Sequence, residues 1–265
     1  MTHEKYSLKR IKEEGATPKR AVAHKLGFFY RLFTPYISYL VINHTQLSAN
    51  FFSLLALIIP AIASALFLSF HPKLILLGAL FHQLGYLCDV LDGEIARLRK
   101  TDNMEGSYID ALNHFFNIPL IFISLSLGAY FSSGNLFYIF AAISLSLFSR
   151  GSGKYCMFYA IGRRREYQKR KLDHFQSNNT QIPEPEENQI INRLKIPWVY
   201  PNITLFILAG AIVNLKLPQM HILEFLIVFY AITYPILDIM ESIRIYSTRR
   251  TQSMYDFLES NDNQR

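Results

Sequence analysis

The sequence predicts an all-α, polytopic membrane protein with six transmembrane helices and an N-terminal amphipathic helix lying in the membrane interface. Three observations predict this class. Hydrophobic residues make up 51% of the 265 residues, and the mean hydropathy is positive, at +0.15. Apolar runs of about 20 residues, the length that crosses a bilayer, recur along the chain. Basic residues gather at the ends of these runs, where they orient membrane proteins.

Several other classes are disfavoured. The formal net charge is +7, but basic residues at the ends of apolar runs favour anionic lipid head groups, so no nucleic-acid partner is expected. Cys88 and Cys156 both lie in apolar segments and predict neither a disulfide framework nor a zinc site. The N-terminus is too polar and too charged for a signal peptide.

The first element is the interfacial helix, expected within residues 18–42, where basic residues alternate with Phe, Tyr and Leu. Pro35 should break or turn this helix. The alternative, an extra span from Phe28 to Val41, is disfavoured by Arg31 and Pro35. Six spans are then expected at about 50–70, 74–97, 106–131, 136–161, 199–215 and 221–245.

These elements divide the chain into three parts. Residues 1–45 form the cytoplasmic N-terminus with the interfacial helix, 46–247 the membrane domain, and 248–265 a cytoplasmic tail. Residues 162–197 are the one long polar segment within the domain and are expected to be a cytoplasmic loop.

Charge asymmetry predicts the orientation. With both termini in the cytoplasm, the basic clusters around RLRK, RRREYQKRK and STRR fall on that side, whereas the opposite side receives only Lys73 and Lys216. The protein is therefore expected to be multi-pass, with the cytoplasmic ends of the second and third spans facing each other across a short loop.

Those two ends carry the acidic segment DVLDGEIARLRKTDNMEGSYIDALNH, residues 89–114. In a helix, Asp89, Asp92, Gly93 and Ala96 share one face, because positions three and four apart are neighbours, and Asp110 and His114 share a face by the same rule. Three carboxylates converging from two helix ends, those of Asp89, Asp92 and Asp110, suit a hard divalent cation such as Mg²⁺. Such oxygen-rich sites commonly serve phosphate chemistry.

Two alternatives come from other classes. Asp92, Glu94 and Arg97 could pair with one another as a solvated surface cluster. The carboxylates could instead bind a cation that a small transporter or channel carries, although transporter sites tend to lie near the bilayer midplane and these acids lie at one membrane face.

The same segment closely resembles the signature of the CDP-alcohol phosphotransferases. That pattern is D-x-x-D-G-x-x-A-R, a spacer, then G-x-x-x-D-x-x-x-D, and here DVLDGEIAR, eight residues and GSYIDALNH correspond. Seven signature positions match: Asp89, Asp92, Gly93, Ala96, Arg97, Gly106 and Asp110. SANFFS at 48–53 is similar to the family's entry to the first span, with Asn50 as the aligned asparagine; a helix-capping role is the alternative there.

The resemblance implies a six-helix membrane enzyme of phospholipid biosynthesis. Such an enzyme uses Mg²⁺ or Mn²⁺ to transfer a phosphate-linked group from a CDP-linked donor to an alcohol and releases CMP, and family members are often dimeric. By analogy, Asp89, Asp92 and Asp110 would hold the metals. The residues Gly93, Ala96, Arg97, Gly106 and Asn50 would line the CDP site, although Arg97 could instead anchor its helix end.

The departure from the pattern is His114, where the family has an aspartate thought to be the general base. Imidazole is a plausible base near neutral pH but a poorer partner for Mg²⁺ than a carboxylate. Two interpretations follow: a working enzyme with His114 as base beside Asp110, or an impaired member that binds CDP-lipid or metal without turnover.

A site in the membrane that opens to the cytoplasm suits a lipid-linked donor such as CDP-diacylglycerol, with membrane lipids around it. The alternative is a CDP-alcohol donor that acts on diacylglycerol. An anionic acceptor would need cations, and the best candidates are Arg150 and Lys154 in the fourth predicted span, with Arg244 in the sixth. Ion pairing with Asp238 and Glu241 is the structural alternative for these cations.

Overall fold

The computed structural model describes residues 6–15, 28–101, 104–149, 156, 160–162, 196–198 and 202–263. In this part of the chain the regular structure is helical, with no strand. The helices are α1 (Leu8–Glu14), α2 (Phe28–His44), α3 (Ala49–Phe67), α4 (Pro72–Arg99), α5 (Met104–Ser133), α6 (Phe137–Phe148), α9 (Asn202–Lys216), α10 (Ile222–Ser247) and α11 (Arg250–Asn263), with 3-10 turns η3 (Ile196–Trp198) and η4 (Pro218–Met220). The predicted all-α class is confirmed for these residues.

Among the residues that the structure describes, four helical segments are long and apolar enough to cross a membrane: Ala49–Phe67, Pro72–Arg99, Tyr108–Ser133 and Pro218–Ser247. They correspond to the first, second, third and sixth predicted spans. Helix α6 lies within the fourth predicted span and α9 overlaps the fifth, but their 12 and 15 residues are fewer than the about 20 that a span needs. The structure therefore supports a membrane protein, and the count of six spans stays a prediction.

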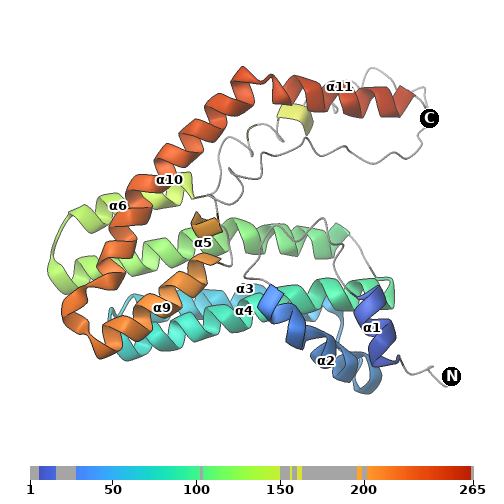
Figure 1. Cartoon of the computed structure of the whole chain (residues 1–265), viewed down its shortest axis with the longest axis horizontal. Helices are drawn as coiled ribbons and strands as arrows, with labels where there is room; N and C mark the ends of the chain where they lie inside the picture. The colour runs from blue at the N-terminus through green and yellow to red at the C-terminus, as the bar shows by residue number, and fades with distance from the viewer. Residues whose placement is uncertain are drawn as a thin grey trace.

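The long helices pack lengthwise, with α3 against both α4 and α5 (Figure 1). Gly128 of α5 makes this approach possible, since a Cβ there would lie 2.5 Å from the carbonyl oxygen of Phe67. Small residues at such crossings are typical of membrane helices. One core cluster joins these helices to α6, α9 and α10, with Phe67, Ile121 and Tyr230 almost fully buried.

Large apolar side chains also cover the outside of the helices. Phe131, Phe140 and Phe225 are each more than 60% exposed. A soluble protein rarely leaves so much apolar surface in water, so acyl chains are the natural covering for these side chains.

The predicted break at Pro35 is wrong. Helix α2 runs from Phe28 to His44 with Pro35 inside it. Proline removes one backbone hydrogen bond, which can be tolerated where neighbouring side chains hold the helix. Here Thr34 and Ser38 on either side of Pro35 are fully buried against α4.

The start of α3 is also defined by a side chain. The backbone N–H of Phe51 donates to Ser48 Oγ at 3.2 Å, so Ser48 is the N-cap. Asn50 therefore lies in the first turn of α3 and is not the capping residue.

Candidate active site

Three side chains of the acidic segment converge from α4 and α5. Asp89 lies on α4, and Asp110 and His114 lie one turn apart on α5. The His114 Nε2 is 3.4 Å from Asp110 Oδ1 and 3.9 Å from Asp89 Oδ1. One ligand atom from each residue lies within 4.8 Å of the others. Asp110 and His114, which follow Asp89 by 21 and 25 positions in the sequence, thus share one polar centre with it.

This centre is open on one side. The side chains of Asp110 and His114 are each 49% exposed, whereas that of Asp89 is 11% exposed. Substrate or solvent can therefore reach the α5 groups, while Asp89 forms the buried wall of the centre.

Asn113 is a site residue that the sequence interpretation missed. Its Nδ2 donates to Asp89 Oδ1 at 2.6 Å, and its Oδ1 accepts from the Nδ2 of Asn117. Both asparagines are almost completely buried. The available signal was spacing, because Asp110, Asn113, His114 and Asn117 follow the i, i+3, i+4, i+7 pattern of one helix face.

Asp92, a predicted metal ligand, lies one turn beyond Asp89 on the continuous helix α4. It is buried, with the Ser53 hydroxyl of α3 as a hydrogen-bond partner. Among the described residues, the three-ligand group contains His114 and not Asp92. The structure thus brings two of the three predicted carboxylate ligands together and adds an imidazole.

Most of the predicted nucleotide-site residues lie on the same two helices as this centre, Gly93, Ala96 and Arg97 on α4 and Gly106 on α5. Gly93 and Ala96 are partly buried on α4, and a Cβ at Gly93 would lie 3.1 Å from Arg97 Nη1. Arg97 donates from Nε and Nη2 to the carbonyl oxygen of Gly15, at 3.0 and 2.8 Å. These hydrogen bonds agree with the alternative that Arg97 anchors the end of its helix. Gly106 is partly buried in the first turn of α5.

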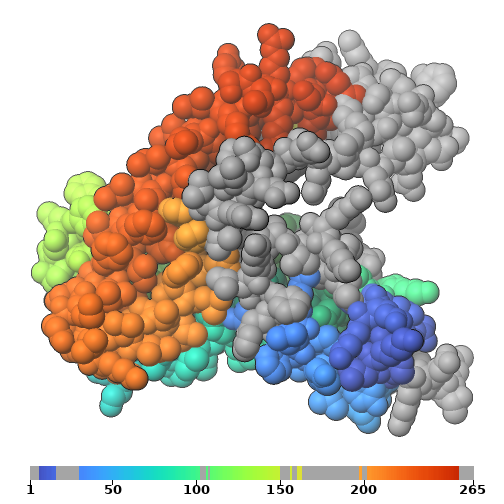
Figure 2. Space-filling model, in the orientation of Figure 1, coloured from blue at the N-terminus to red at the C-terminus, as the bar shows by residue number. Residues whose placement is uncertain are grey.

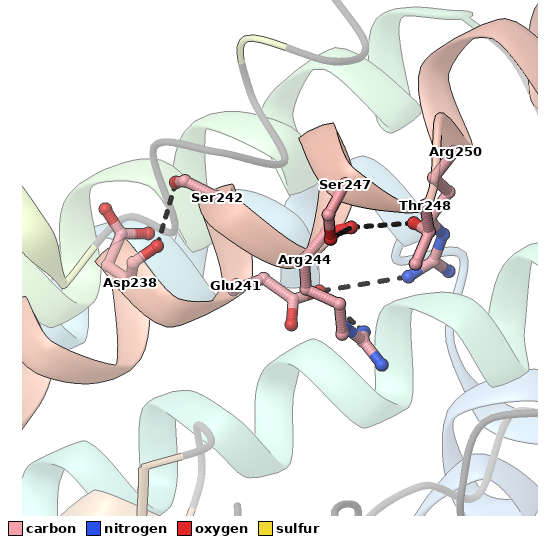
Figure 3. A network of polar contacts seen from close by, with 7 residues as sticks. All are labelled: Asp238, Glu241, Ser242, Arg244, Ser247, Thr248 and Arg250. Carbon is pink, nitrogen blue, oxygen red and sulfur yellow. Dashed lines mark hydrogen bonds and ion pairs between the residues drawn. The ribbon is translucent and has the colours of Figure 1, made fainter.

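Two predicted cations, Arg150 and Lys154, lie outside the described residues. The third, Arg244, donates from Nη2 to Glu241 Oε1 at 2.8 Å on α10 (Figure 3). Arg250 lies 3.8 Å from the same carboxylate. Ion pairing is thus what the structure shows for Arg244 and Glu241, in agreement with the structural alternative.

A second buried carboxylate, Glu94, faces α2. Its Oε1 accepts from Thr34 Oγ1 at 2.6 Å and its Oε2 accepts from Ser38 Oγ at 2.7 Å. Glu94 is 4% exposed, so the suggested surface pairing with Asp92 and Arg97 does not describe it. Its role is to hold α2 on α4.

A tyrosine near the start of α2 makes a further polar contact with α4. Tyr30 donates its hydroxyl to Gln83 Oε1, and its ring lies edge-on to Tyr86. Burial, with a smaller contribution from Tyr86, raises the pKa of Tyr30 to about 12. Tyr30 therefore stays a neutral donor at physiological pH.

The donor atoms of the Asp89, Asp110 and His114 cluster fit a divalent cation. Two carboxylates and one imidazole supply oxygen and nitrogen donors within 4.8 Å of one another. Two atoms that bind one ion at about 2.0–2.2 Å are at most about 4.4 Å apart, so these side chains would have to move closer together to bind it. Imidazole binds transition-metal ions better than it binds Mg²⁺, so His114 favours Mn²⁺ relative to an all-carboxylate set.

These observations define a class: a helical membrane protein with a candidate divalent-metal site formed by two neighbouring helices. The sequence profile of the CDP-alcohol phosphatidyltransferase family matches residues 46–233, and the chain belongs to this family. A search of curated proteins finds no match. The family implies transfer of a phosphate-linked group from a CDP-alcohol to an alcohol acceptor in a membrane, and its members use a divalent metal.

Proposed function

We propose that this protein transfers a phosphatidyl, or another substituted phosphate, group from CDP-diacylglycerol to an alcohol and releases CMP. The observation that carries the proposal is the convergence of Asp89, Asp110 and His114 within a family that acts on CDP-alcohols. A lipid donor is favoured because the cluster lies on two apolar helices, both long enough to cross a membrane.

In the proposed reaction, an acceptor hydroxyl oxygen forms a bond to the phosphorus that carries the diacylglycerol. The bond from that phosphorus to the bridging oxygen of the diphosphate breaks, and CMP leaves with the electron pair. A divalent ion held by Asp89 and Asp110, with Asp92 near by, would neutralise the charge on the diphosphate.

The hydroxyl proton needs an acceptor, and His114 is the proposed base. Its imidazole is half exposed and lies 3.4 Å from Asp110, so an acceptor alcohol can approach it and the carboxylate can orient the ring. One nitrogen cannot hold a metal and take up a proton at the same time. As a base, His114 must therefore use its Nε2 free of metal, or use the other ring nitrogen.

Further parts of the proposal rest on the sequence. The active centre faces the cytoplasm, on the same side as both termini, because the basic loops gather there. The cations Arg150 and Lys154 serve an anionic acceptor. Gly93, Ala96, Arg97, Gly106 and Asn50 line the CDP site of the membrane domain, and the protein forms a homodimer like many family members.

The test is CMP release by purified protein in nanodiscs that contain radiolabelled CDP-diacylglycerol. Glycerol 3-phosphate, inositol, inositol phosphate and serine would be supplied in turn with Mg²⁺ or Mn²⁺. We expect one alcohol to give metal-dependent CMP and a labelled lipid product. Asp89→Asn and Asp110→Asn should lower the rate by about 100-fold or more, whereas Asp256→Asn on the exposed face of α11 should not change it.

The second candidate function is CDP-lipid binding without turnover, and the imidazole at position 114 favours it. Restoring the family aspartate with His114→Asp separates the two. A large gain in CMP release would identify the natural protein as impaired, whereas a fall would identify His114 as a working base. Wild-type CMP release in Asp89→Asn would contradict the proposed metal-dependent transfer.

A further inference from the structure

A cavity of about 340 Å³ lies between α1, α2 and α4. It is lined by Ile11, Lys12, Arg31, Leu32, Pro35, Tyr36 and Glu94. Glu94 follows Asp92 by two residues, which is about 200° around a helix, so the cavity and the candidate metal site of Asp89, Asp110 and His114 lie on different sides of α4. None of the lining residues belongs to that centre.

The cavity carries a net positive charge from two cations and one carboxylate. Both Glu94 oxygens already accept hydrogen bonds from α2. Arg31 has a buried Nε without a hydrogen-bond partner among the described residues. Buried polar groups normally have a partner, so this nitrogen calls for an acceptor.

Lys12 brings the second cation. Its Nζ lies 4.9 Å from the centre of the Tyr36 ring and 3.4 Å from the Tyr36 hydroxyl. Both contacts are at the exposed side of the cavity, and an ammonium group on a flexible side chain can turn from them to a bound anion. The cavity therefore offers a planar guanidinium group from Arg31 and an ammonium group from Lys12 to the same ligand.

An apolar surface adjoins these cations. Leu32, Tyr36 and Leu40 are exposed and four residues apart on α2, so they form one stripe along the helix. Leu32 and Tyr36 also line the cavity. A ligand bound at Arg31 would therefore place its charged group in the cavity and could lay an apolar part along this stripe. In Figure 2, α1 and α2 (blue) lie together at one end of the molecule.

We propose that this cavity binds the head group of an anionic phospholipid, with its phosphate on Arg31 and Lys12 and its acyl chains along Leu32, Tyr36 and Leu40. The site is separate from the proposed reaction and would tie the N-terminal helices to the membrane surface. Inorganic phosphate could use the two cations but not the apolar stripe, which is why a lipid is favoured as the source of the anion.

Lipid binding to the full-length protein in detergent tests this site, measured by native mass spectrometry during titration with dioleoylphosphatidylglycerol. Arg31→Gln should weaken the tightest binding step about fivefold, the effect of one cation near a lipid surface. Lys12→Gln should weaken it by a similar or smaller factor, and Arg31→Lys should restore part of the loss. The matched control is Lys216→Gln at the exposed end of α9, which should bind like wild type.

Two further experiments identify the source of the anion and the place where it binds. Inorganic phosphate at millimolar concentration should not displace the lipid, and Asp89→Asn should keep the wild-type affinity. Equal affinity of Arg31→Gln and Lys216→Gln would overturn the site, as would loss of the lipid in Asp89→Asn. Displacement by inorganic phosphate would overturn its assignment to a lipid. None of these readouts depends on CMP release, so failure here is distinguishable from failure of the proposed enzyme.

Discussion

The side-chain amide of Asn113 on α5 donates to Asp89 Oδ1 on α4 at 2.6 Å. This bond joins the two halves of the acidic segment from the buried side, behind the exposed groups Asp110 and His114. The α4 and α5 helices both pack on α3. The Asn113 amide links α4 and α5 directly, through a side-chain hydrogen bond beside the candidate metal site. Asn113 is therefore a positioning residue for the proposed metal ligand Asp89.

Replacement of Asn113 should misplace Asp89 without removing a ligand. We expect Asn113→Ala to weaken metal binding or activity by about 10–100-fold, the usual effect of losing a partner that orients a ligand. Titration of Mn²⁺ followed by electron paramagnetic resonance, without substrate, measures the binding part. Asn117→Ala, one turn further from Asp89, should have a smaller effect, and equal losses in the two variants would contradict the positioning role.

The metal preference should follow the donor at position 114. Because imidazole favours transition-metal ions, His114→Asp should raise the affinity for Mg²⁺ relative to Mn²⁺. Competition of Mg²⁺ against bound Mn²⁺ in the same resonance experiment checks this without turnover. His114→Gln removes the imidazole without adding a carboxylate, and it should weaken Mn²⁺ binding. An unchanged Mg²⁺ to Mn²⁺ ratio in His114→Asp would exclude His114 from the ligand set.

The Glu94 hydrogen bonds should stabilise the position of α2. The double variant Thr34→Val, Ser38→Ala leaves a buried carboxylate without two of its donors, which costs about 1–3 kcal/mol for each lost partner. We expect a lower thermal midpoint in detergent and faster proteolysis in the segment before α3. Thr248→Val, whose hydroxyl bonds an exposed carbonyl at the end of α10, is the control. A midpoint equal to that of the control would show that these bonds contribute nothing.

The close contact at Gly128 should tolerate no side chain. A Cβ there would meet the backbone oxygen of Phe67, so Gly128→Ala must push α3 and α5 apart, at a cost of about 1–3 kcal/mol. Gly162→Ala adds the same methyl group at a helical position where no atom of the described residues lies within 4 Å, and it should be neutral. Thermal unfolding in detergent compares the two, and equal midpoints would refute the packing argument.

Much of the site could be predicted from local periodicity. A helix places positions three and four apart on one face, so the pairing of Asp110 with His114 followed from spacing alone. The helical premise for residues 89–97 and 106–114 is confirmed, since these residues lie within α4 and α5. Asn113 was overlooked although the same periodicity includes it, because an amide lacks the charge that marks a carboxylate in an apolar run.

The sequence by itself determined the helical class, the membrane environment, the family signature and the departure at His114. Each depends on the order of residues along the chain. Only the tertiary structure decided that His114 joins Asp89 and Asp110 in one group without Asp92, that Asn113 bridges to Asp89, and that Glu94 turns to α2. Contacts between helices depend on their separation and rotation, and these are set by packing contacts such as Gly128 on Phe67, far apart in the sequence.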